Sequence, residues 1–112
     1  MKGVIVRFDA PRVTINGAEY QILISPMELL AACSRYLSRI AEVNPADEAQ
    51  VRCIIMDGCD IAEEALGAGA MAKIAAGAPV SLPGVMKVLN AAMDAANRAY
   101  HGYVRRNYGG GQ

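Results

Sequence analysis

Short runs rich in apolar and β-branched residues, separated by turn residues, occupy the first 24 positions, which is typical of β-strands. Residues 4–8 are Val-Ile-Val-Arg-Phe, and residues 12–15 alternate with the period of two of a half-buried strand. Asn16-Gly17 then predicts a type I′ turn, because both central residues of that turn need positive φ. A return strand over 19–24 places three large apolar side chains on one face: Tyr20, Ile22 and Ile24. We therefore predict a meander of two or three strands.

From residue 25 the apolar spacing changes to the three-and-four pattern of an amphipathic helix. Ser25 followed by Pro26 and Glu28 predicts the helix start, because serine caps, proline suits the first turn and glutamate completes a capping box. We expect the main apolar stripe to be Leu30, Cys33, Leu37 and Ile40, with Leu29, Tyr36 and Val43 alongside. A stripe this wide suits a helix packed on two neighbours.

Asn44-Pro45 repeats the cap-and-proline signal, so a second helix is expected to open at residues 44–47. Its expected apolar face is Val51, Ile54, Ile55, Gly58, Ile61, Ala62, Ala65 and Leu66. A glycine in a helix interior costs about 1 kcal/mol relative to alanine. Gly58 therefore predicts a close helix crossing.

The glycine-rich residues 67–70 interrupt the helical pattern, and a short helix over 71–76 is expected to stop at Gly77. A long last helix is expected to start at Ser81 or just after it. Its predicted apolar stripe is Val85, Val88, Leu89, Ala92, Met93, Ala96, Ala99, Tyr100 and Tyr103. We thus predict an α+β fold: an N-terminal hairpin or meander of two to three strands, then a bundle of three to four helices. Residues 1–108 would form one domain and 109–112 a flexible glycine-rich tail.

Composition agrees with a single domain, because 112 residues are near the usual domain size. Apolar residues make up 54% of the chain, above the roughly 45–50% of ordinary soluble domains, and much of the excess is alanine. Alanine favours helices and close helix packing. The alanine and methionine content fits two arrangements, an alanine-rich monomer core or a surface buried in an oligomer.

Charge is balanced overall but unevenly placed. With 11 basic and 11 acidic residues, the chain has no net field to attract DNA or RNA. Residues 42–64 are acidic and residues 73 onward are basic, so either two neighbouring helices complement each other or the basic end docks an acidic partner. The candidate partner-binding residues at that end are Arg98, His101, Arg105 and Arg106. Tyrosines among them also fit nucleic-acid contact or, more simply, core packing.

Cysteine usage indicates a reducing compartment. Three cysteines cannot all pair within one chain, and Cys33, Cys53 and Cys59 each lie in a helical pattern among apolar residues, where reduced cysteine is a small buried hydrophobe. Neither an export signal nor an apolar run long enough to cross a bilayer is present. We therefore expect a soluble cytoplasmic protein that does not enter membranes.

Motifs for catalysis are missing from the sequence. His101 is the only histidine, with no cysteine or carboxylate at metal-ligand spacing. Gly67-x-Gly follows a helix and lacks the Gly-Lys-Ser/Thr of a phosphate-binding loop. No serine has a nucleophile-elbow context. We therefore predict a binding or assembly module rather than an enzyme, with no catalytic residue, metal site or cofactor.

The order of parts resembles a group of small proteins from the structural modules of tailed phages and prophages of Gram-positive bacteria. The likeness rests on two segments, Val-Thr-Ile-Asn-Gly-Ala-Glu-Tyr over residues 13–20 and Ala-Leu-Gly-Ala-Gly-Ala-Met-Ala-Lys-Ile over residues 65–74. Proteins of that group are generally taken to be tail assembly chaperones or minor tail-module proteins. The resemblance implies a chaperone or adaptor that binds a helical partner such as the tape-measure protein. No functional residue carries over from it.

Three functions follow as hypotheses. The first is the phage-module chaperone or adaptor, whose apolar helical groove would mask helices of a long protein partner. The second is a self-assembling structural subunit, a dimer or ring of a phage-derived particle, because a short sheet has edges that a second copy could extend. The third is a small nucleic-acid-binding protein that uses the basic C-terminal helix.

Overall fold

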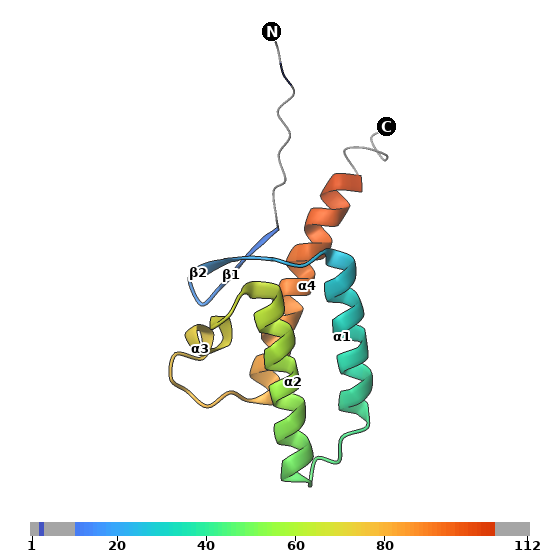
Figure 1. Cartoon of the computed structure of the whole chain (residues 1–112), viewed down its shortest axis with the longest axis vertical. Helices are drawn as coiled ribbons and strands as arrows, with labels where there is room; N and C mark the ends of the chain where they lie inside the picture. The colour runs from blue at the N-terminus through green and yellow to red at the C-terminus, as the bar shows by residue number, and fades with distance from the viewer. Residues whose placement is uncertain (1–2, 4–10, 105–112) are drawn as a thin grey trace.

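The computed structural model describes residue 3 and residues 11–104, with the backbone alone for residues 100–104. Within these residues two strands, β1 (Arg12–Ile15) and β2 (Ala18–Gln21), precede four helices. The helices are α1 (Pro26–Ala41), α2 (Glu48–Leu66), α3 (Ala70–Ala75) and α4 (Leu82–Val104) (Figure 1). This order confirms the predicted α+β fold. The predicted strand over 4–8 and the tail over 109–112 lie outside the described residues.

The hairpin forms at the predicted turn. Its strands pair antiparallel, and Asn16 and Gly17 have φ values of 52° and 81°, as a type I′ turn requires. Strand β2 stops at Gln21 rather than at residue 24. The reason is that the Leu23 N–H donates to the Ala65 carbonyl at the end of α2, 2.7 Å away, so the chain leaves the sheet for the helices.

Two side chains tie the hairpin to α3. The Asn16 amide nitrogen donates to the Ile74 carbonyl over 3.2 Å, and the Lys73 ammonium lies 5.6 Å from the centre of the Tyr20 ring. On the inner face, Val13 and Tyr20 pair across the strands and are both buried. The hairpin therefore covers one end of the helical layer, as Figure 1 shows.

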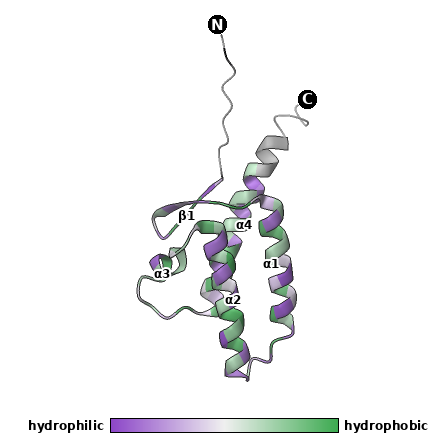
Figure 2. Cartoon of the chain, in the orientation of Figure 1, coloured by the Kyte–Doolittle hydropathy of each residue, from purple (hydrophilic) through white to green (hydrophobic). Residues whose placement is uncertain are grey.

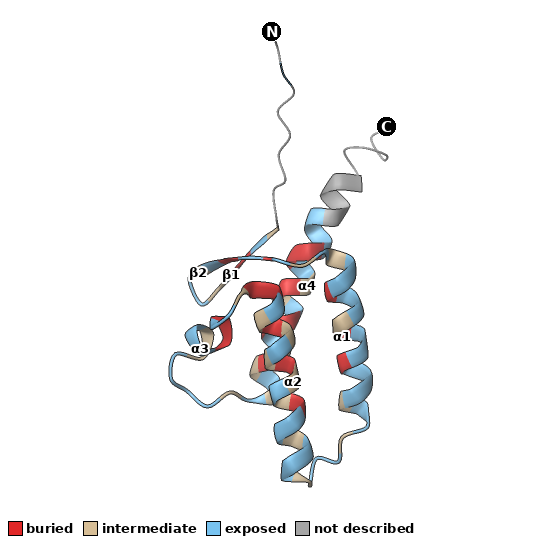
Figure 3. Ribbon diagram, viewed as in Figure 1, coloured by how far each residue is buried: buried red, intermediate tan, exposed pale blue. Residues whose placement is uncertain are grey.

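Helices α1, α2 and α4 lie side by side, and their buried residues face one another (Figures 1 and 3). The most extensive helix contact joins α2 to α4, and α1 packs on both. The buried residues of α2 and α4 include five alanines beside larger side chains: Ala62, Ala65, Ala92, Ala95 and Ala96 with Ile54, Val85 and Leu89. These alanines belong to the core of a single copy.

Gly58 lies where α1, α2 and α4 come closest, as predicted from its place in the helix. A Cβ atom on this residue would lie 2.7 Å from Cζ of Tyr36 and would overlap a methyl of Val85. The Tyr36 hydroxyl donates a hydrogen bond to the Ile54 carbonyl, one turn earlier in α2. Only a residue without a side chain allows this approach.

The start of α1 is as predicted, and the start of α2 is corrected. Ser25 Oγ accepts from the Glu28 N–H at 3.1 Å, which is the expected N-cap. For α2 the cap is Asp47 instead of Asn44. Asp47 Oδ1 accepts from the N–H groups of Ala49 and Gln50, both in the first turn of α2, while the Asn44 side chain accepts from the Ala46 N–H and closes a separate turn.

The last two helices differ from the prediction in small ways. Helix α3 starts one residue early, at Ala70, and Ser81 caps α4 by accepting from the Gly84 N–H. Ala99 is exposed rather than part of the apolar stripe, because the end of α4 extends past the other helices (Figure 1). The side chains of the two tyrosines predicted beyond it lie outside the described residues.

Among the described residues, no direct ion pair joins the acidic α2 to the basic α4. There the acidic α2 forms an ion pair with α1, between Asp57 and Arg39, and the basic α4 forms one within itself, between Asp94 and Arg98. Helices α2 and α4 are neighbours, as charge complementarity between them requires, and that interpretation of the charge pattern stays a prediction.

Candidate partner-binding surface

The four residues proposed from the sequence for partner binding are only partly placed. Arg98 is exposed, and its guanidinium contacts the Asp94 carboxylate one helical turn earlier. His101 belongs to α4, but its side chain lies outside the described set, as do Arg105 and Arg106 entirely. The described structure therefore brings together none of these four side chains.

A different surface comes from an error in the predicted stripe of α1. The buried side chains of this helix are Leu29, Cys33 and Tyr36. Leu30 and Leu37, which we expected in the core, are each 46% exposed. The two candidate stripes run in parallel along the helix, one residue apart, and both are apolar. Their spacing alone could not show which one faces the bundle.

The exposed stripe of α1 has the spacing of a coiled-coil seam. Positions 27, 30, 34, 37 and 41 follow one another at alternating intervals of three and four residues. They carry Met27, Leu30, Ser34, Leu37 and Ala41, all exposed and none charged. Figure 2 shows hydrophobic and hydrophilic positions alternating around this helix. Such a seam suits contact with another helix.

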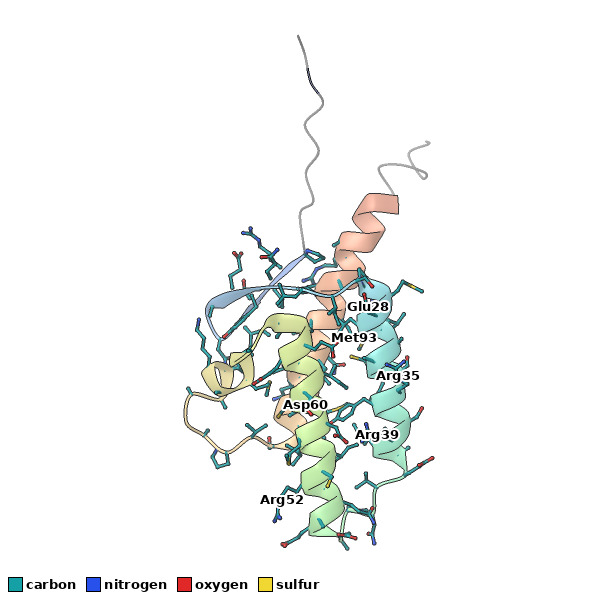
Figure 4. The ribbon with its side chains drawn as sticks, viewed as in Figure 1. Glu28, Arg35, Arg39, Arg52, Asp60 and Met93 are labelled. Carbon is teal, nitrogen blue, oxygen red and sulfur yellow. The ribbon has the colours of Figure 1, made fainter. Side chains whose placement is uncertain are left out.

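Helix α4 extends this surface. Its half-buried Met86 and Met93 line a narrow cleft together with Leu37 of α1, and the exposed Asn90 between them is also uncharged. Figure 4 shows Met93 beside α1. We refer to Met27, Leu30, Leu37, Met86 and Met93 as the apolar surface.

On its opposite flank α1 forms a polar groove with α2. This groove has a volume of about 360 Å³ and is lined by the charged residues Glu28, Arg35, Arg39 and Glu64 among others. Figure 4 shows Arg35 and Arg39 on the side of α1 that faces α2. The two flanks of one helix thus differ in chemistry.

A third hollow lies between the hairpin, α3 and the start of α4. Its volume is about 260 Å³, and apolar side chains such as Ile15, Met71, Ile74 and Val88 line it, with Lys87 as its charged lining residue. Binding sites for small molecules usually measure roughly 300–1,000 Å³. This hollow is below that size and holds no pair of titratable groups.

The cysteines differ in exposure and are all free thiols. Burial raises the pKa of Cys33, and burial followed by the nearby Asp60 and Glu63 charges raises the pKa of Cys59. Such thiols stay protonated and are poor nucleophiles. Cys53 is exposed, which corrects the expectation that all three are buried. Among the described residues, no three His, Cys, Asp or Glu side chains gather as metal ligands would.

No protein-family model, curated protein or solved structure matches this chain. In the described part of the chain, no helix combines the length and the apolar character needed to cross a membrane.

Proposed function

We propose that this chain is a non-enzymatic binding module, an assembly chaperone or adaptor that holds a helix of a protein partner on its apolar surface. The observation that carries the proposal is the exposure of Met27, Leu30 and Leu37 in one uncharged seam, at 72%, 46% and 46%. Isolated exposed apolar residues are ordinary, whereas apolar residues that gather on one face of a protein mark interaction sites.

The geometry favours a helix as the bound element. The three-and-four spacing of the seam matches the spacing of an amphipathic helix, which can lay its apolar face against such a seam. Methionine side chains are unbranched and polarisable, so they adapt to different partner surfaces. With Met27, Met86 and Met93, this surface suits a partner that presents several similar helical segments.

The resemblance to tail assembly chaperones supplies the class of partner. A tape-measure protein is long and helical, and its apolar faces need cover until the tail tube forms around it. A chaperone that covers such a partner acts in the cytoplasm of the host cell. The self-assembling subunit and the nucleic-acid-binding protein stay as alternatives, the latter resting on Arg98, His101, Arg105 and Arg106.

The test is co-purification of the chain with the product of the neighbouring long coiled-coil gene, expressed in the same cells. Leu37→Glu places a charge in the seam and is expected to reduce recovery of the partner at least tenfold. Met56→Glu is the matched control, since Met56 is 60% exposed in α2 and lies outside the apolar surface. Equal recovery with both variants, or no partner with the wild-type chain, would contradict the proposal.

A further inference from the structure

The hollow between the hairpin, α3 and the start of α4 has mostly apolar walls. Each of these elements contributes to them: Ile15 from the hairpin, Met71 and Ile74 from α3, and Val88 from α4. A water molecule held inside a protein needs about two to four polar partners, and walls of this kind offer few. The hollow therefore suits an apolar group better than it suits water.

Small residues keep the hollow open. Ala75, Ala78 and Gly84 line it and carry too little side chain to fill it. Gly84 lies within α4, where alanine would be the better helix former. A Cβ atom on Gly84 would meet only the Ser81 Oγ atom, 3.2 Å away. The first turns of α4 therefore present bare backbone to the hollow and leave room beside it.

Two of the walls are fixed to each other within the chain. The Asn16 amide nitrogen donates to the Ile74 carbonyl, and the Lys73 ammonium lies over the Tyr20 ring, so two contacts join the hairpin to α3. Binding sites for small molecules are usually largely pre-formed in this way. A ligand would not have to order these two elements, which lowers the cost of binding.

Lys87 gives the hollow a positive charge at its edge. Among the described residues that line the hollow, Lys87 alone is charged, and it takes part in none of the ion pairs found in this part of the chain. The Ser81 hydroxyl accepts from the Gly84 N–H and can still donate its own hydrogen. A carboxylate carries one negative charge and two acceptor oxygens, so it matches an ammonium and a hydroxyl as donors.

We propose that the hollow binds a small apolar carboxylate, with the hydrocarbon part between the hairpin, α3 and α4 and the carboxylate beside Lys87. The volume of about 260 Å³ limits the size of this ligand. An apolar protein cavity of about 150 Å³ holds one benzene molecule, so a ligand of about ten non-hydrogen atoms fits here. Few atoms make few contacts, and a dissociation constant of about millimolar order is expected. The inference goes beyond the proposed function, because the hollow shares no residue with the apolar surface.

Two probes that differ in charge test the site and the ligand class. They are para-fluorobenzoate and its uncharged analogue para-fluorobenzamide, which have the same ring. Fluorine NMR gives the two dissociation constants, and amide NMR spectra of the whole chain locate the site. We expect shifts at the residues that line the hollow and about fivefold weaker binding of the benzamide. No binding of the benzoate at about 20 mM, shifts confined to other residues, or equal affinity for both probes would overturn the inference.

Removal of the charge tests the role of Lys87. The variant Lys87→Met keeps an unbranched side chain and should bind the benzoate about fivefold more weakly, with the benzamide changed by less than about twofold. Arg98→Met is the matched control, because Arg98 is an exposed cation about three turns along the same helix and does not line the hollow. Equal affinity of the two variants for the benzoate would overturn the placement of the carboxylate beside Lys87.

Filling the hollow tests the placement of the apolar part. Ala75→Leu puts a larger side chain into the hollow and should weaken binding of both probes about fivefold or more. Ala72→Leu is the matched control, because Ala72 is an exposed alanine of α3 that does not line the hollow. Unchanged affinity of a folded Ala75→Leu variant would overturn the inference. Should that variant not fold, Lys87→Met still decides, because Lys87 is exposed.

Discussion

The two flanks of α1 are built from the same helix but hold different chemistry. Toward α2, directed polar contacts hold the helices together, the Arg39–Asp57 ion pair and the hydrogen bond from Tyr36 to Ile54. On the side of α1 toward α4, the outward side chains are methionine and leucine, which are uncharged and partly exposed to water. The first flank has its partner groups within the chain, whereas the second leaves apolar area in contact with water.

This difference separates folding from association. Directed contacts specify one geometry, so changes on the α2 flank are expected to reduce the free energy of unfolding. Half-exposed apolar side chains contribute little to folding, because only part of their area leaves water. Changes on the apolar surface should therefore alter binding while leaving the fold intact. Measurements of stability alone can test this separation.

The largest effect is expected from two adjacent leucines. Leu29 is fully buried, and Leu29→Ala should lower the free energy of unfolding by about 3 kcal/mol through lost burial and the cavity left behind. Leu30→Ala removes the same atoms one residue away on the apolar surface and should cost less than about 1 kcal/mol. Urea denaturation of both variants at a concentration where the chain is monomeric makes the comparison. Similar losses in the two variants would show that the apolar surface is part of the folding core.

The second largest loss of stability is expected from a substitution at Gly58, where α2 contacts α1. Gly58→Ala gains about 1 kcal/mol of helix propensity but forces a methyl group against Tyr36 and Val85, so a net loss of about 2 kcal/mol is expected. The matched control is Gly84→Ala, because a Cβ there meets only Ser81 Oγ, at 3.2 Å, and Gly84 is also helical. Thermal denaturation of both variants measures the difference. An unchanged melting temperature for Gly58→Ala would show that α1 and α2 can move apart without cost.

The sequence pattern correctly predicts those features of the fold that depend on a few neighbouring residues. The Asn16-Gly17 turn, the Ser25 cap and the glycine crossing at residue 58 depend on the chemistry of a few neighbouring residues, and all three are confirmed. The cap of α2 was misplaced because Asn44 and Asp47 both have capping side chains. Because Pro45 directly follows Asn44, the pattern favoured Asn44 as the cap, whereas Asp47 caps α2 in the structure.

The candidate site was beyond the reach of sequence pattern for a physical reason. Residues 29, 33 and 36 form one apolar stripe of α1, and residues 30 and 37 form another, one position round the helix. Which stripe faces the core depends on how α2 and α4 sit around α1, and that is set by contacts far apart in sequence. The pattern did contain one usable signal. The outer stripe alternates large residues with alanine and serine, while the inner stripe is continuous.

The smallest expected effect concerns the hydroxyl of Tyr36, which contributes a single hydrogen bond on the α2 flank. At neutral pH, Tyr36→Phe should lower the free energy of unfolding by about 1 kcal/mol, because the ring still fills its place and only the bond to the Ile54 carbonyl is lost. Chemical denaturation at pH 7 measures this loss.

The same hydroxyl makes stability depend on pH in the alkaline range. Burial, followed by the nearby Cys59 and Asp57 charges, raises the pKa of Tyr36 above its ordinary value of 10.0. The unfolded chain therefore releases this proton at lower pH than the folded chain does. As pH rises through 10 the unfolded state is stabilised relative to the folded one, so the free energy of unfolding falls.

The variant Tyr36→Phe has no phenolic proton to lose, so its free energy of unfolding should decline less steeply above pH 10. Cys33, whose pKa burial also raises, still makes both proteins less stable from about pH 9. The difference between wild type and variant should therefore shrink from pH 8 to pH 11. Denaturation curves that stay parallel over this range would mean that the hydroxyl ionises as freely in the folded chain as in the unfolded one, and that the α2 flank is open to water like the apolar surface.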